Sequence, residues 1–166
     1  MIDAARHSTP VPAGILQLLV LALIWLVAGS TFGIWRGYDP ATWPAATFVV
    51  VHQGTVRGLN ILLPAMGLVT LLGTLVLAIR ARLNRPLLLT YAAALVCVAS
   101  AAAITRLVNQ PINADIMQWS ADAMPVAWAD VRDRWWTWHV VRMTVTICGA
   151  LLLTVAIDLD RNRLRD

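Results

Sequence analysis

The chain has 166 residues, of which 59% are apolar, and its formal net charge is +4. An apolar fraction this high is typical of a protein whose solvent is lipid, and it argues against an ordinary soluble domain of this length. All 13 basic residues are arginines and all 9 acidic residues are aspartates, spread without a basic patch, so we exclude nucleic acid as a partner.

Four apolar stretches are long enough to cross a membrane as helices. A bilayer core of about 30 Å requires roughly 20 helical residues, because lipid offers the backbone no hydrogen-bond partners. The predicted spans are residues 15–35, 59–79, 87–104 and 139–157. Pro64 predicts a kink near the start of the second span. We therefore expect an all-α fold in which residues 1–166 form one integral membrane domain, a four-helix bundle.

The first span carries Gly29 and Gly33 at a four-residue spacing. Small residues at this spacing allow two helix backbones to approach closely. The pair therefore predicts a close helix contact in the outer half of the bundle.

The distribution of arginines predicts the orientation of the bundle. The short link at residues 80–86 carries three arginines and no acidic residue. Loops of this kind stay in the cytoplasm, and Arg6 and three arginines of the C-terminal tail then lie on the same side. Both termini are thus predicted to be cytoplasmic. The longer connections, residues 36–58 and 105–138, face outward, and seven of the eight tryptophans lie at this end, as is typical of a membrane interface.

The outer connections are predicted to be helical in part. Pro40 and Pro44 are typical of helix starts, so the second helix is expected to begin well before the membrane. Large apolar residues recur at intervals of three and four on a face that leads into the fourth span: Trp128, Val131, Trp135 and Trp138. The third helix is predicted to end at Arg106, and residues 109–125, which contain two prolines, are predicted to form a loop.

The second, third and fourth helices bring polar side chains to this outer end. They are His52, Arg57, Asn60, Arg106, Asn109, Asn113, Trp135, Trp138, His139 and Arg142. Ionisable groups at membrane depth are costly unless they pair or line a wet cavity, so these residues predict a pocket in the outer leaflet. Two plainer interpretations stay open: the arginines reach lipid headgroups, and the asparagines end a helix.

The same polar residues are also compatible with two classes of protein other than an enzyme that binds a small molecule in this pocket. No metal-ligand spacing is present, so we predict no metal, but His52 and His139 lie on separate helices of a bundle and would suit a haem or a copper ion in a redox protein. The second class is a non-catalytic protein that binds lipid or a partner helix. Whether the protein forms a homo-oligomer is left open. Signatures of serine hydrolases and nucleotide-binding loops are absent from the sequence.

Three stretches resemble the anthrone-oxygenase-like family of small membrane proteins: HQGTVRGLNILLP (52–64), RLVNQPINADIMQWS (106–120) and WADVRDRWWTWHVVR (128–142). The most specific part is an N-x-P-x-N element, Asn109 to Asn113, followed by a tryptophan-rich stretch that ends in H-x-x-R, His139 to Arg142. The resemblance covers nearly the whole chain. Most bacterial members have no assigned substrate, and the few characterised members oxidise anthrone-type polyketides to anthraquinones with molecular oxygen and are regarded as needing no cofactor.

The resemblance implies a membrane oxygenase that acts on a small hydrophobic aromatic compound and O2. We expect it in a bacterial inner membrane, and the orientation predicted from the arginines places its site on the periplasmic or outer side. Either His139 or His52 would serve as the base. The developing enolate or superoxide charge would be stabilised by Arg142, Arg106, Asn109 and Asn113. The substrate would be bound by the remaining polar residues and by two indole rings: Asn60, Arg57, Trp135 and Trp138.

Overall fold

The computed structural model describes residues 11–163, and this part of the chain is almost entirely helical. The expected all-α fold is therefore confirmed. In chain order the elements are α1 (Val11–Gly37), the 3-10 turn η1 (Pro40–Thr42), α2 (Ala45–Leu59), α3 (Leu62–Arg80), α4 (Arg85–Ile104), the π-helical turn η2 (Thr105–Asn109), α5 (Gln110–Ile116) and α6 (Trp128–Arg163).

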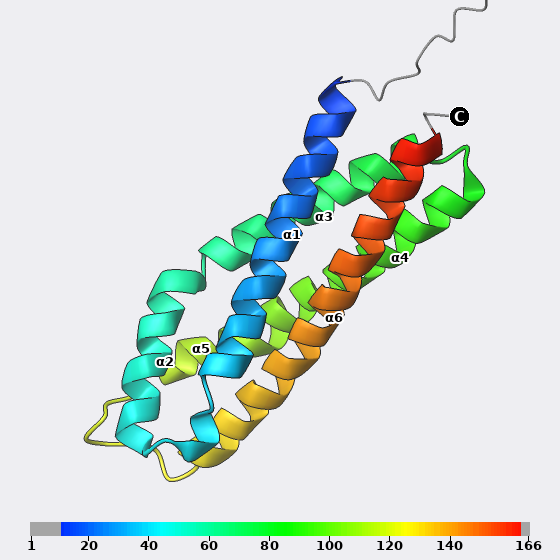
Figure 1. Ribbon diagram of the computed structural model, residues 1–166. Coiled ribbons are helices and arrows are strands. Elements are labelled where there is room, and N and C mark those ends of the chain that lie inside the picture. Colours follow the sequence, from blue (N-terminus) through cyan, green and yellow to red (C-terminus); the bar gives the residue numbers. More distant parts are fainter. Residues whose placement is uncertain (1–10, 164–166) are drawn as a thin grey trace, which may run out of the picture.

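Helices α1, α3, α4 and α6 form the bundle that Figure 1 shows as four long rods. Within the described residues, four helical segments are long and apolar enough to cross a membrane: Ala13–Thr42, Leu62–Arg80, Arg85–Ile116 and Trp128–Arg163. The start of α1, the end of α6 and the link between α3 and α4 lie at one end of the molecule (Figure 1). This end carries the arginine-rich link, whereas Arg6 and the last arginine of the tail lie outside the described residues.

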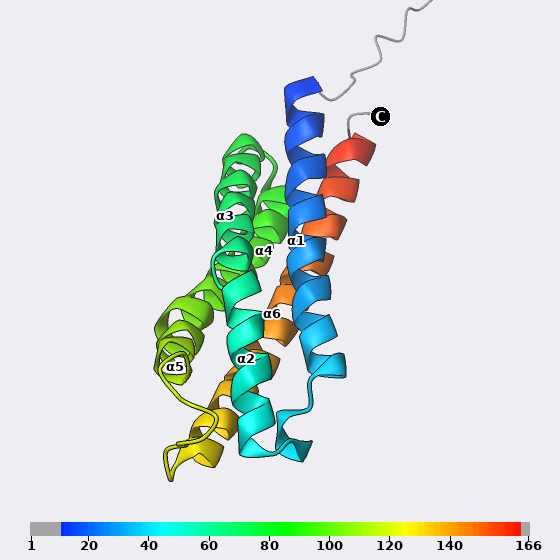
Figure 2. The same cartoon turned by 90° about the vertical axis from the view of Figure 1, so that its left-hand side faces the viewer.

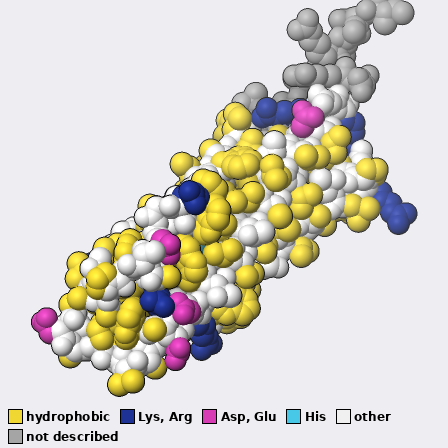
Figure 3. All heavy atoms as spheres, turned by 60° about the horizontal axis from the view of Figure 1, so that its bottom comes forward, with side chains coloured by type: hydrophobic (Ala, Val, Ile, Leu, Met, Phe, Trp, Pro, Cys, Tyr) yellow, Lys and Arg dark blue, Asp and Glu magenta, His cyan; other side chains and the backbone are white. Residues whose placement is uncertain are grey.

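Apolar side chains cover much of the surface between the two ends of the molecule, and acidic side chains lie toward the ends (Figure 3). Many of these apolar residues are strongly exposed, for example Leu18 at 58% and Val96 at 65%. A soluble bundle would bury such residues, whereas a bundle in lipid has no reason to do so. The surface therefore agrees with the four membrane-spanning helices.

The interior of the bundle is packed where small residues bring helices together. A Cβ atom added at Gly73 of α3 would collide with Val20 of α1, and one added at Gly149 of α6 would lie 3.1 Å from the Cβ atom of Cys97 in α4. The close contact predicted at Gly29 and Gly33 is wrong, because a Cβ atom at either position would meet nothing within 4 Å. Both glycines are exposed on α1, so they face away from the packed interior.

The second predicted helix is broken into α2 and α3 by Pro64. Proline has no N–H, and its ring collides with the carbonyl group four residues earlier, here that of Asn60. The chain turns at Asn60 and Ile61, and the Asn60 carbonyl oxygen accepts a hydrogen bond of 3.4 Å from Gln110 Nε2 instead. The predicted kink is thus confirmed as a complete break, which directs α2 away from the line of α3 (Figure 1); Figure 2 shows the same two helices from the side.

The third helix runs further than predicted. Pro111 does not end it, because the π-helical turn η2 widens the helix just before the proline, and Gln110 N–H donates to the Thr105 carbonyl oxygen five residues earlier. The helix then continues as α5 to Ile116. The predictions of a helix end at Arg106 and of a loop over residues 109–125 are therefore wrong, and the connection is limited to residues 117–127.

The outer end has a hydrophobic core of its own, formed by Tyr38 after α1 and by residues of α2, α5 and the start of α6. Its buried members are Tyr38, Phe48, Val49, Ile112, Ile116 and Trp135, and several partly buried tryptophans pack around them. The helical extensions predicted for α2 and α6 are confirmed. Because these extensions share a core, polar residues on them are held at fixed positions relative to one another.

Candidate functional site

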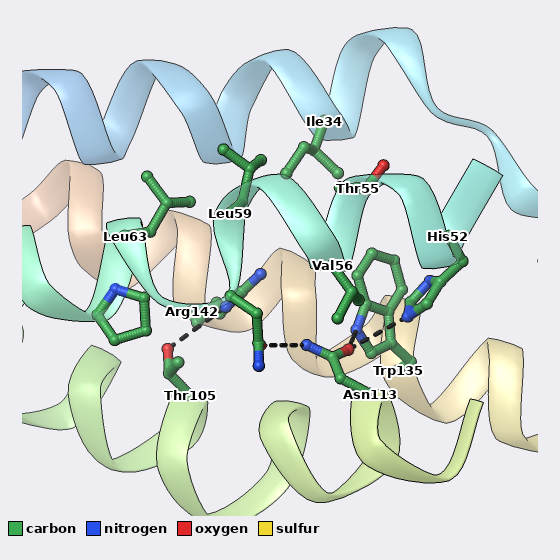
Figure 4. Close-up of a pocket in the computed structure, with 12 residues that line it drawn as sticks. Ile34, His52, Thr55, Val56, Leu59, Leu63, Thr105, Asn113, Trp135 and Arg142 are labelled. Atoms are coloured by element: carbon green, nitrogen blue, oxygen red, sulfur yellow. Dashed lines mark hydrogen bonds between the residues drawn. The ribbon is translucent and has the colours of Figure 1, made fainter. Parts of the chain in front are cut away.

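Asn113 is the centre of the polar site, and Figure 4 shows its carboxamide oxygen directed toward the side chains of both His52 and Trp135. Its Oδ1 accepts a hydrogen bond of 2.8 Å from Trp135 Nε1, and its Nδ2 donates one of 2.8 Å to Asn60 Oδ1. An indole N–H can only donate, so the Trp135 contact fixes which end of the carboxamide is the acceptor. Asn113 is held at this point by α5, the helix that continues past Pro111.

The orientation of Asn113 determines the tautomer of His52. Asn113 Oδ1 can only accept, so His52 Nε2, 3.2 Å away, carries the proton and donates. The lone pair of His52 Nδ1 then accepts a hydrogen bond of 3.0 Å from the Tyr38 hydroxyl group. Burial lowers the pKa of His52 to about 4; the hydrogen bond with Asn113 opposes this decrease and the Arg142 charge adds to it. His52 is therefore a neutral imidazole at physiological pH.

The second histidine, His139, is fully buried on α6 and binds an arginine. Its Nε2 donates a hydrogen bond of 3.1 Å to the backbone carbonyl oxygen of Thr31 in α1. Its Nδ1 therefore offers a lone pair, which accepts a hydrogen bond of 3.1 Å from Arg142 Nη2. His139 thus links α1 to the Arg142 side chain and orients the guanidinium group.

The two imidazole rings do not suit a haem between them. The Trp135 ring contacts both: its centroid lies 4.6 Å from the centroid of the His52 ring and 5.1 Å from the centroid of the His139 ring. All four imidazole nitrogens already have hydrogen-bond partners. A planar macrocycle would have to displace Trp135, a residue of the outer core, so this arrangement does not support the haem alternative. Within residues 11–163 no three His, Cys, Asp or Glu side chains are grouped as metal ligands.

Arg142 is a cation in the interior that lacks an acidic partner. Its Nη1 donates to Thr105 Oγ1 over 3.4 Å, and its buried Nε has no hydrogen-bond partner. In the part of the chain that the structure describes, the one ion pair is that of Arg132 with Asp133, at 2.8 Å. A guanidinium group removed from water is stabilised by a nearby negative charge, which Arg142 does not receive from any residue between 11 and 163.

Arg142 lies where two cavities meet. A small cavity of about 30 Å³ is lined by polar side chains that include His52, Asn60 and Asn113. A larger cavity of about 280 Å³ lies mainly among apolar side chains of α1, α3 and α4. Arg142 and Thr105 line both cavities. The larger one is close in size to the pockets that bind small organic molecules, roughly 300 Å³ and above.

The structure brings most of the predicted site residues together, although not all of them line a cavity. His52, Asn60, Asn113, Trp135 and Arg142 surround the small cavity, and Arg106 lines the larger one. Two predicted residues are buried beside the site without lining either cavity: His139, described above, and Asn109, whose Nδ2 donates to the Trp135 carbonyl oxygen over 3.4 Å. Two others lie apart from both cavities: Arg57, which is exposed, and Trp138, which is 37% exposed.

Sequence reasoning did not identify four groups that complete the site: Tyr38, the Thr31 carbonyl group, Thr105 and Gln110. Tyr38 lies in the predicted connection between the first two spans. A phenol in a short connection before a helix that carries a histidine could have predicted the contact between Tyr38 and His52. The Thr31 carbonyl group belongs to the backbone, so no pattern of side chains predicts its hydrogen bond with His139. Gln110 acquires its role only because Pro64 breaks the helix at Asn60.

The fold and the site together define a four-helix membrane protein with a partly buried polar site at one end of the bundle. The chain belongs to the anthrone oxygenase family, whose model matches residues 52–152, and it is thus an oxygenase-like membrane protein. The resemblance noted in the sequence is confirmed, and the matched range includes every site residue from His52 to Arg142. No curated protein and no solved structure matches the chain.

Proposed function

We propose that this protein oxidises a hydrophobic aromatic compound of the anthrone type with molecular oxygen and without a metal or organic cofactor. The observation that carries the proposal is the position of Arg142. Its guanidinium group has no acidic partner in the described part of the chain, and it lies between an apolar cavity of about 280 Å³ and a small cavity lined by His52. The arrangement is suited to an apolar molecule that becomes negatively charged as it reacts.

The proposed reaction converts a CH₂ group between two aromatic rings into a carbonyl group. A base removes one proton from the CH₂ group, and the resulting carbanion, delocalised as an enolate, transfers an electron to O2. The substrate radical and superoxide combine to a C–OO⁻ group, which takes up a proton to form a hydroperoxide. Loss of water then leaves C=O. One substrate and one O2 give one quinone and one water, so no external reductant is required.

His52 is the proposed proton acceptor. Among the residues that line the two cavities it is the one imidazole, and the other ionisable side chains there are Arg106 and Arg142. Its low pKa keeps the ring neutral and thus able to accept a proton. A proton can reach the lone pair of Nδ1 through the Tyr38 hydroxyl group, which donates its own proton to Nδ1 as it accepts another, since a phenol both donates and accepts hydrogen bonds.

Arg142 is the proposed binding group for the enolate and for superoxide. Fixed donors in an apolar surrounding stabilise a developing charge more than water does, because they need no reorganisation. His139 is a positioning residue in this scheme, since its Nδ1 accepts a hydrogen bond from Arg142. The site would face the periplasm of a bacterial inner membrane, because it lies at the end of the bundle opposite the arginine-rich link of residues 80–86.

The test is oxygen consumption by the purified protein with an anthrone, after dialysis against a chelator. We expect turnover above the background of buffer, and we expect Arg142→Gln to lower the rate by about 100-fold or more, as loss of one charge-stabilising donor does in other enzymes. Arg57→Gln is the matched control, because Arg57 is exposed at the same end and lines neither cavity. Equal rates for Arg142→Gln and Arg57→Gln, or rates no higher than buffer for the wild type, would contradict the proposal.

A further inference from the structure

The larger cavity is closed on one side and open on the other. Of its lining residues from α1 and α6 none is exposed: Ile24, Thr31 and Thr146 are buried, at 2%, 3% and 4% exposure, and Val27 and Arg142 are partly buried. The exposed lining residues belong to α3 and to the α4 to η2 segment: Leu68 is 55% exposed, and Ala102 and Arg106 are exposed as well. The opening therefore lies between α3 and α4, on a side of the bundle that faces lipid.

Small residues form much of the cavity wall near this opening. Gly67 of α3 and Ala101 and Ala102 of α4 line the cavity from its two sides. A Cβ atom added at Gly67 would meet nothing within 4 Å, so the glycine borders empty space. The cavity thus results from the absence of side-chain volume at these positions, and it is reached through the side of the bundle.

A permanent positive charge lies at the opening. Arg106 on η2 is exposed, and its Nη1 donates a hydrogen bond of 3.3 Å to Gln110 Oε1, another lining residue. None of the described aspartates lines the cavity, so neither Arg106 at the mouth nor Arg142 further in is neutralised by a described residue of the wall. A neutral hydrocarbon would gain nothing from a cation at the mouth, whereas a carboxylate would gain a charge-assisted hydrogen bond.

We propose that this cavity admits its ligand sideways from the lipid, between α3 and α4, and that it selects hydrophobic aromatic compounds bearing a carboxylate group, which Arg106 binds at the mouth. The aromatic body occupies the apolar part of the cavity, which leaves Arg142 for the charge that develops during reaction. The inference rests on the proposed function in taking this cavity as the substrate site, and it adds the chemical class of the substrate.

Binding of two probes in a nonionic detergent tests the inference without any turnover. Anthracene-9-carboxylate and anthracene-9-carboxamide share one aromatic body and differ in charge. We expect the carboxylate to bind the wild type about tenfold more tightly, as a hydrogen bond to a charged group contributes roughly 1.5 kcal/mol or more. Arg106→Gln should remove this preference and leave carboxamide binding unchanged, whereas Arg57→Gln, the exposed control, should retain it.

A second pair of variants tests whether binding takes place in the cavity. Gly67→Leu fills the cavity and should lower the affinity for both probes at least tenfold. Gly29→Leu is the matched control, because Gly29 is also free of contacts within 4 Å but is exposed on α1 and lines no cavity. Equal losses in the two glycine variants, or no loss in Gly67→Leu, would overturn the assignment of the cavity as the binding site.

The remaining outcomes separate this inference from the proposed function. Equal affinities of the wild type for the two probes, or a preference that depends on Arg142 and not on Arg106, would overturn the selection by Arg106. Displacement of the carboxylate by stoichiometric phosphatidylglycerol, dependent on Arg106, would identify the anion as a lipid phosphate and would equally overturn it. In each case oxygen consumption with an uncharged anthrone is still measurable, so the oxygenase proposal stands or fails separately.

Discussion

At the scale of single residues, the site owes its protonation pattern to Asn113. The Trp135 indole N–H, which can only donate, fixes the Asn113 carboxamide, and this in turn fixes the proton of His52 on Nε2. The Tyr38 hydroxyl group then caps the other nitrogen. The polar groups that make His52 a neutral base are thus supplied by α5, α6 and the connection after α1, three segments far apart in sequence.

The pKa of His52 gives the first prediction at this scale. The imidazole must be neutral to accept a proton, and burial lowers its pKa from 6.5 to about 4. We therefore expect kcat/KM for anthrone oxidation to stay constant as the pH falls to about 5 and then to decrease, with an apparent pKa near 4. A rate profile that loses activity around pH 6.5 would contradict the assignment of His52 as the buried base.

Tyr38→Phe gives the second prediction. The variant keeps the aromatic ring but removes the donor to His52 Nδ1, a hydrogen bond that stabilises the neutral imidazole. The apparent pKa at which activity is lost in acid should therefore increase from about 4. The free energy of unfolding in detergent should decrease by about 1 kcal/mol. Tyr91→Phe is the control, because Tyr91 is also buried and hydrogen-bonded, but to Asp160 at the other end of the bundle. An unchanged apparent pKa in Tyr38→Phe would refute the role given to the phenol.

At the scale of elements, two prolines determine where the polar residues lie. Pro64 frees the Asn60 carbonyl group and separates α2 from α3, so that Asn60 ends α2 with its side chain within 2.8 Å of Asn113. Pro111 follows the π-helical turn, and the helix beyond it carries Asn113 into the outer core. Irregular backbone near the membrane interior is tolerated where neighbouring side chains satisfy the freed groups, as Gln110 does here.

Pro64→Ala tests the function of the break. Alanine restores the N–H group and removes the clash with the Asn60 carbonyl group, so α2 and α3 should approach one continuous helix. We expect oxygen consumption to decrease at least tenfold while thermal stability is retained, because Asn60 no longer meets Asn113. Pro86→Ala, in the first turn of α4, should have little effect, since proline is readily accommodated there. Full activity in Pro64→Ala would show that the break has no catalytic role.

The same prolines explain which parts of the fold were predictable from sequence. The four spans follow from hydropathy and length, and the start of α6 follows from the regular spacing of Trp128, Val131 and Trp135. Pro64 was correctly interpreted as a kink. The helix end predicted at Arg106 and the loop predicted around Pro111 are wrong, because local patterns do not reveal that a π-helical turn makes room for the proline ring.

At the scale of the whole molecule, helix packing decides which polar residues share a site. The periodicity of α2 and α6 was sufficient to select His52, Asn60, Trp135 and Arg142, which the fold does bring together. It was not sufficient to distinguish the buried Trp135 from the more exposed Trp138. Both lie on the same face of α6, and only part of that face is turned toward the interior. The size and the sideways opening of the larger cavity depend on Gly67, Ala101 and Ala102 of different helices, and no single segment predicts them.

The defining feature of the proposed reaction is that an oxygen atom from O2 enters the substrate. Labelling with ¹⁸O2 measures this directly, with wild type, Arg142→Gln and buffer compared by mass spectrometry of the quinone product. We predict that the wild type forms more product than Arg142→Gln or buffer does. One ¹⁸O atom should be in the new carbonyl group of this product and the second in water. Unlabelled product accompanied by labelled hydrogen peroxide would instead show an oxidase, and it would contradict the oxygenase mechanism.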